Sequence, residues 1–223
     1  HYIGTVDGQR SSLASITVVE DEILGVVSYG GVNYNLEPVT NLKDNYIIYK
    51  QDDVKTELNF QCDTGSEPEP NPIGEFSSEQ IGTSRSAAGD IGILLECDYE
   101  MFKANGSNVS NTSNYVTSLF NMVKGLYAMN PTNVSIVISE IVVNSAPDIY
   151  DAANASGTSE LLNAFSCEYR NGYNGRMAHL LTTASVGGGL ANRPSCPSSG
   201  TYSSALYGVS GSLNNSFNPN LSV

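Results

Sequence analysis

The chain has 223 residues, of which 40% are hydrophobic, enough for one sizeable domain or two small ones. Acidic side chains outnumber basic ones by 23 to 10, and the net charge of -13 offers no cationic surface to the phosphate backbone of a nucleic acid. No stretch reaches the roughly 18 consecutive apolar residues that a membrane-spanning helix needs. We therefore expect neither a nucleic-acid partner nor a transmembrane segment.

Residues 1–62 are predicted to form a small antiparallel β domain. Short alternating apolar runs are separated there by acidic or glycine turns at the spacing of β-hairpins. Glu20-Asp21-Glu22 marks one turn and Gly30-Gly31 the next. The predicted strands cover residues 15–19, 23–29, 32–36 and 45–50.

Residues 63–90 have a different composition, with Ser-Glu-Pro-Glu-Pro-Asn-Pro followed by a Gly/Ser/Ala-rich stretch. Such a segment buries too little apolar surface to offset its ordering entropy, so we interpret it as an inter-domain linker. Arg85 is the one basic residue in it and is a candidate processing site, because exposed backbone is accessible to proteases. A linker arginine placed for solubility explains the same residue.

Residues 91–223 are predicted to form an α/β domain. Ile91 to Cys97 is a nearly continuous apolar run, as in a buried strand, and Thr112 or Ser113 is expected to cap a helix that Asn130-Pro131 ends. A second helix is expected over residues 158–170, and strands over residues 134–143, 178–182, 189–191 and 206–210. This order predicts two helices packed on a twisted mixed sheet, so the whole chain is expected to be of the α/β or α+β class.

The search for a self-contained catalytic or metal site gives no strong candidate. The two histidines, His1 and His179, belong to no cluster with metal-ligand spacing, and no Gly-x-Ser-x-Gly motif is present. Asp98 and Glu100, two residues apart, are candidate paired carboxylates for acid/base work or cation binding. Alternatively, Asp98 ends the strand and orders the turn that follows.

The cysteines and the glycosylation motifs suit an exported protein. Cys62, Cys97, Cys167 and Cys196 lie too far apart for a Cys-x-x-Cys motif and are disulfide candidates or single thiols, with three possible pairings left open. Asn-x-Ser/Thr motifs begin at Asn105, Asn108, Asn111, Asn133, Asn154, Asn214 and Asn220.

A resemblance to a known family rests on the segment Leu94-Leu-Glu-Cys-Asp-Tyr-Glu-Met-Phe102 and on the motifs that follow it in order. These are His179-Leu-Leu-Thr182, Gly188-Gly-Leu-Ala191, Cys196 and Gly208-Val-Ser210. Over residues 91–212 the chain resembles the N-terminal part of the catalytic domain of reprolysin-like metzincins, which are secreted zinc metallopeptidases. Gly4-Thr-Val-Asp-Gly8 and Tyr34-Asn-Leu-Glu-Pro38 resemble the propeptide of the same proteases.

The resemblance implies that residues 1–62 are a latency domain in which Cys62 binds the catalytic zinc, with a disulfide as the alternative role for this cysteine. It also implies that Gly188, Gly189, Leu190 and Ala191 form an edge strand that pairs with a peptide or protein substrate. Gly92 and Arg176 stand near positions where the family has calcium-binding carboxylates, so no such calcium site is expected.

The family's His-Glu-x-x-His-x-x-Gly-x-x-His helix would begin shortly after Val223. We therefore expect that this chain holds no zinc and no catalytic residue, is inactive alone, and needs the remaining C-terminal part of the same protein. The resemblance thus implies a secreted or cell-surface zinc endopeptidase, here as a pro-catalytic fragment. The alternative is a non-catalytic metzincin-like surface or assembly protein.

Overall fold

The computed structural model describes residues 1–19, 22–39, 42, 44–53, 90–129, 135–151, 156–192 and 206–213. These residues form one five-stranded antiparallel sheet, a second five-stranded sheet of mixed direction, and helices that pack on the second sheet. The α+β class expected from the sequence is therefore confirmed. The predicted linker lies outside the described residues except for Asp90, as does the boundary at residue 62.

The N-terminal sheet is a meander in which each strand pairs with the next along the chain. Its strands are β1 (Tyr2–Gly4), β2 (Leu13–Val19), β3 (Glu22–Tyr29), β4 (Val32–Pro38) and β5 (Tyr46–Lys50), with short 3-10 turns η1 (Val6–Gly8) and η2 (Gln51–Asp53). Gly30 and Gly31 turn the β3–β4 hairpin with φ angles of +61° and +78°, a conformation that glycine adopts without steric cost. The four predicted strands are confirmed, and β1 is an addition to them.

The core sheet has the strand order β7-β6-β8-β10-β9. It consists of β6 (Ile91–Cys97), β7 (Ile136–Val143), β8 (Met177–Leu181), β9 (Gly189–Asn192) and β10 (Leu206–Ser210). All neighbouring strands are parallel except β9, which runs antiparallel to β10. β9 therefore lies at one edge of the sheet, and β7 lies at the other.

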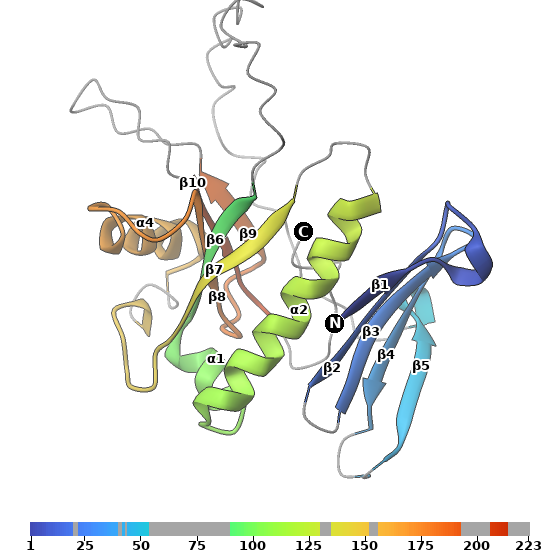
Figure 1. Cartoon of the computed structure of the whole chain (residues 1–223). Coiled ribbons are helices and arrows are strands. Elements are labelled where there is room, and N and C mark those ends of the chain that lie inside the picture. Colours follow the sequence, from blue (N-terminus) through green and yellow to red (C-terminus); the bar gives the residue numbers. More distant parts are fainter. Residues whose placement is uncertain are drawn as a thin grey trace, which may run out of the picture.

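The two long helices cover opposite faces of the core sheet (Figure 1). Helix α2 (Val109–Met129) packs Val116 and Phe120 against Leu95 and its neighbours on one face. Helix α4 (Thr158–Glu168) packs Phe165 against Leu180 on the other face. The alternation of side chains along the buried strand β6 supplies both apolar layers.

The start of α2 differs from the sequence-based expectation. The helix begins at Val109, because the Asn108 side chain accepts a hydrogen bond from the backbone N–H of Asn111 at 3.0 Å and so acts as the cap. Thr112 lies inside the first turn, where its hydroxyl donates to the carbonyl oxygen of Asn108 at 2.9 Å. The prediction of Thr112 or Ser113 as the capping residue is therefore wrong.

Helix α2 has a second buried face, which lies against the N-terminal sheet (Figure 1). Leu119 and Met122 of α2 form an apolar cluster with Leu13 of β2 and Val26 of β3. The wide apolar stripe of α2 thus packs against both sheets. Leu119 contacts the N-terminal sheet, and the next residue, Phe120, contacts the core sheet.

Candidate functional site

The predicted substrate-binding edge coincides with β9 and the residue before it. Gly189, Leu190 and Ala191 lie in the strand, and they pair with Ser210, Val209 and Gly208 of β10. Gly188 precedes the strand with a φ of 142°, and its carbonyl oxygen accepts a hydrogen bond from the Gly211 N–H at 2.8 Å. Within the described part of the chain, no strand pairs with the other side of β9. Binding of a substrate there stays a prediction.

An apolar cavity of about 290 Å³ lies next to this edge, between α2 and the core sheet. Ala191 of β9 and Gly208 of β10 belong to its wall, together with apolar side chains of β6, β8 and α2. Its lining residues are Ile91, Ile93, Leu95, Val116, Leu119, Phe120, Val123, Tyr127, Ile136, Met177, His179, Leu181, Ala191, Leu206, Tyr207 and Gly208. None of them is an aspartate, glutamate, lysine or arginine, so the cavity favours apolar contacts.

His179 is the one ionisable imidazole in the cavity wall. Its Nε2 lies 2.9 Å from the hydroxyl oxygen of Ser210 on the neighbouring strand, and burial lowers the pKa of His179 to about 4. The ring occupies the space that a side chain at position 208 would need, because a Cβ built on Gly208 would lie 2.6 Å from Nδ1. At neutral pH His179 is therefore neutral, with its ring against Gly208 and its Nε2 already partnered by Ser210.

The described residues do not provide a zinc site. Among them, no group of three or more histidine, cysteine, aspartate or glutamate side chains is placed to hold a metal ion. His1 lies on the N-terminal sheet, where its Nδ1 is 3.0 Å from the Thr17 hydroxyl, and His179 is engaged with Ser210. The residues present thus do not fit zinc coordination, and we derive no step of catalysis from them.

Two of the four cysteines and the proposed processing site lie outside the described residues, namely Cys62, Cys196 and Arg85. The other two cysteines are described and are free thiols, with Cys97 buried and Cys167 exposed. Burial raises the pKa of Cys97, and the nearby carboxylates of Asp98 and Glu96 raise it further. Cys97 is therefore a protonated core residue at neutral pH and a poor metal ligand.

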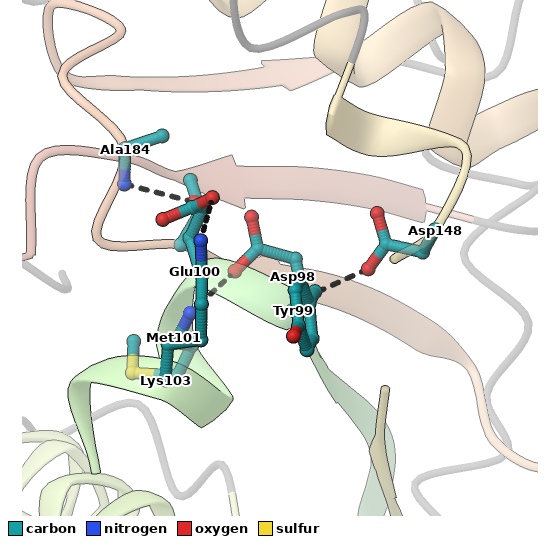
Figure 2. Close-up of polar contacts among 8 residues, drawn as sticks. Asp98, Tyr99, Glu100, Met101, Lys103, Asp148 and Ala184 are labelled. Carbon is teal, nitrogen blue, oxygen red and sulfur yellow. Dashed lines mark hydrogen bonds and ion pairs between the residues drawn. The ribbon is translucent and has the colours of Figure 1, made fainter. Parts of the chain in front are cut away.

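Asp98 and Glu100 do not form a carboxylate pair (Figure 2). Asp98 is buried at the end of β6 and accepts a hydrogen bond from the backbone N–H of Met101 at 2.8 Å, which caps the short helix α1 (Tyr99–Ala104). Glu100 lies in the first turn of α1 and forms an exposed ion pair with Lys103 at 2.6 Å. The geometry supports the structural role of Asp98 and not the catalytic one.

A polar cluster around the buried Glu96 lies at the same ends of β6 and β7 and was not predicted from the sequence. Glu96 Oε1 accepts a hydrogen bond from the Asn144 amide at 2.8 Å, and the same amide donates to Asp148 at 3.0 Å. Asp148 also accepts from the backbone N–H of Tyr99 at 2.8 Å and so ties the segment after β7 to the start of α1 (Figure 2). The signal in the sequence is a single glutamate within the apolar run of β6.

Burial is the main influence on Glu96 and raises its pKa, while the hydrogen bond from Asn144 and the nearby hydroxyl groups of Tyr169 and Tyr150 oppose the shift. Glu96 Oε2 and the buried Tyr150 hydroxyl have no hydrogen-bond partner among the described residues. Burial also raises the pKa of Tyr150 and Tyr169. Glu96 is buried and Asn144 and Asp148 are half-buried, and their hydrogen bonds connect the end of β6 to the segment after β7.

In the described part of the chain, no helix is long and apolar enough to cross a lipid bilayer. A comparison with protein-family models found no match to the chain, and a search of curated proteins found none either.

Proposed function

We propose that the chain is the propeptide and the N-terminal part of the catalytic domain of a secreted zinc-dependent endopeptidase. The observation that carries this proposal is β9, an edge strand of sequence Gly-Leu-Ala-Asn that runs antiparallel to β10. An extended peptide adds to such an edge through backbone hydrogen bonds, which hold a substrate without regard to most of its side chains. In this proposal, Gly189, Leu190 and Ala191 bind the backbone of the peptide that is cut.

The apolar cavity supports a role for the remaining C-terminal part of the protein. Leu213, which follows β10, is buried in the cluster that Phe120 and Leu181 form between α2 and the core sheet. Its backbone N–H donates to the carbonyl oxygen of Thr182 at 3.2 Å, so the chain leaves β10 on the α2 side. The apolar wall of the cavity is favourable to cover, and in this proposal the remaining C-terminal part of the protein covers it.

In the complete protease, a histidine-containing helix outside this chain would hold zinc, which would supply the activation of water for peptide-bond hydrolysis. In this proposal the described residues bind the substrate and provide the surface that the C-terminal part covers. β9 orients the peptide, and the neutral His179 keeps a charge out of the wall that the later segment would cover. This chain alone is then inactive.

The test compares this chain with the full natural product of its gene. We expect peptide hydrolysis that a zinc chelator abolishes in the longer protein, and none in residues 1–223 alone. Chelator-insensitive hydrolysis, or a natural product that lacks a zinc-binding helix, would overturn the proposal. Intact-mass measurement of the natural protein answers the second point directly.

Two proline substitutions in the longer protein examine β9 itself. Neighbouring residues of a strand direct their N–H groups to opposite sides, so Leu190→Pro and Ala191→Pro remove N–H groups from different edges of β9. One variant should lose a bond to β10 and with it stability. The other should keep its stability and raise KM by roughly tenfold, the effect of about 1.4 kcal/mol. An unchanged KM in both variants argues against binding at this edge.

The second candidate, a non-catalytic surface or assembly protein, is favoured by the outer face of the N-terminal sheet. Strand register places Tyr2, Ile16, Gly25, Leu36 and Ile48 in one row across it, facing away from α2. Tyr2 is 69% exposed and Ile48 67% exposed, which leaves an apolar face of the kind that proteins use for association.

A second copy of the chain is the partner that suits this face. The register places one charged strand residue, Lys50, on it, so two chains with a net charge of -13 can approach there with little repulsion. Sedimentation should then show a dimer that Ile48→Lys converts to a monomer, whereas Ile149→Lys, at another exposed site, should not. A monomer at all concentrations excludes this assembly.

A further inference from the structure

Leu119, Met122 and Leu126 form one face of α2, which we call its outer face. This face packs on the N-terminal sheet through a small, fully buried contact. Leu13 and Val26 of the sheet are 2% and 1% exposed, and Leu119 and Met122 of the helix are 3% and 0% exposed. Leu24, Tyr115 and Leu126 pack around these four residues. The contact therefore excludes water at its centre.

At one point the helix and the sheet approach each other more closely than ordinary side chains permit. A Cβ built on Gly125 would lie 3.0 Å from both Cβ and Oγ of Ser15, and Ser15 is fully buried. The Ser15 hydroxyl donates to the carbonyl oxygen of Asn121 at 3.3 Å, one turn before Gly125. The pair fixes where β2 crosses α2, because a larger residue at either position would separate the two surfaces.

No strand of one sheet pairs with a strand of the other in the described part of the chain. The N-terminal sheet takes its strands from residues 2–50 and pairs them in chain order, and the core sheet takes its strands from residues 91–210. The contact is also mixed, since Ser15 hydrogen-bonds to α2, and Thr17 and Asn35 are buried on the same face of the sheet as Ser15. A contact of this composition is typical of two units that meet as folded bodies.

From these observations we infer that the outer face of α2 is a binding surface for residues 1–53 as a separate polypeptide. The partner that fits it is a five-stranded antiparallel sheet that presents Leu13, Ser15 and Val26. If the chain is cut between residues 54 and 89, the two fragments stay together as a complex. Gly125 sets how closely α2 and the N-terminal sheet approach each other in it. This contact lies on α2 and not on β9, so cutting the chain and freeing the N-terminal sheet are two separate events.

The test uses the full chain with residues 66–72 replaced by the recognition sequence of a site-specific protease. After complete cutting, we expect both fragments of the wild type to elute together in gel filtration at micromolar concentration. Gly125→Leu should raise the separated fraction at least tenfold. Gly4→Leu is the matched control, because a Cβ at Gly4 meets no atom within 4 Å, and its fragments should elute together.

Separation of the wild-type fragments on cutting alone overturns the inference, and this arm needs no variant to fold. Retention of both fragments by a folded Gly125→Leu chain overturns the role of Gly125. Native mass spectrometry of the cut wild type gives an independent reading of the same complex. The inference does not require that the protein is a protease, so its failure and that of the proposed function are distinguishable.

Discussion

His179 occupies a position where protonation opposes folding, and the effect is large enough to measure. In the unfolded chain the imidazole takes up a proton below about pH 6.5. In the folded protein burial among apolar side chains lowers the pKa to about 4. Between these two pKa values the unfolded state binds a proton that the folded state does not, so stability falls as the pH is lowered from 6.5 to 4.

The size of the effect follows from the difference between the two pKa values. One unit corresponds to about 1.4 kcal/mol, so the difference between 6.5 and about 4 limits the loss to about 3 kcal/mol. The ring is only partly enclosed, with one side on the cavity, so we expect a loss of about 2 kcal/mol at pH 4.5. The neutral ring keeps its hydrogen bond between Nε2 and the Ser210 hydroxyl.

The assay is urea unfolding of the wild type and of His179→Gln at pH values from 7.5 to 4.5 and constant ionic strength. Glutamine keeps a partner for Ser210 but does not titrate. The difference in unfolding free energy between the two proteins should change by about 2 kcal/mol over this range. The buried Glu96 has a raised pKa, so its contribution decreases as the pH rises, but it is present in both proteins and cancels.

His1→Gln is the matched control, because it removes the other histidine and leaves the cavity intact. It should retain the pH dependence of the wild type. If the difference between the wild type and His179→Gln stays constant within about 0.5 kcal/mol across the pH range, the reasoning about the buried neutral imidazole is refuted.

Two further predictions concern the elements that hold the core sheet. Phe165→Ala should lower the free energy of unfolding by about 3 to 5 kcal/mol, because Phe165 is fully buried against Tyr169 and Tyr207; Ile149→Ala, at an exposed site, should change it by less than about 0.5 kcal/mol in the same denaturation assay. Asp98→Ala should cost about 1 kcal/mol by removing the cap of α1, and Asp98→Asn clearly less; equal losses in the two variants would exclude the capping role.

The strands and helices were predictable because their apolar residues recur at clear periods. The continuous apolar run of β6 and the alternating segments of β2 to β5 are confirmed at nearly their full length. The three-residue strand β1 was not predictable, since its residues are all exposed and carry no alternating pattern. The start of α2 was misplaced because Asn108, Thr112 and Ser113 are all capable caps and only the backbone geometry selects Asn108.

The packing of the N-terminal sheet on α2 was not predicted, although the helix carried a signal for it. Leu119, Met122 and Leu126 widen its apolar stripe beyond what one sheet can cover. Periodicity does not identify the element that packs on the second face of a helix, because that packing depends on contacts between residues distant in sequence. The same limit hid the cluster of Glu96, Asn144 and Asp148, whose members are brought together by the pairing of β6 with β7 and by the segment that follows β7.

A role for the candidate site was proposed only through a resemblance. The residues at 188–191 contain no ionisable group, and their position at a sheet edge follows from the order of five strands. Glycine and alanine give no chemical signal in a sequence. The structure therefore locates β9 at the sheet edge, and the binding of a peptide there is our proposal.

The chain-order pairing of the N-terminal sheet also has a consequence for how the protein folds during synthesis. Hairpins between neighbouring strands close short loops and form quickly, whereas the parallel strands β6, β7 and β8 must wait for the crossover segments between them. The ribosome releases residues 1–53 first. We expect the finished meander to receive α2 as it emerges and to shield Leu119 and Met122 from aggregation until the core sheet is complete.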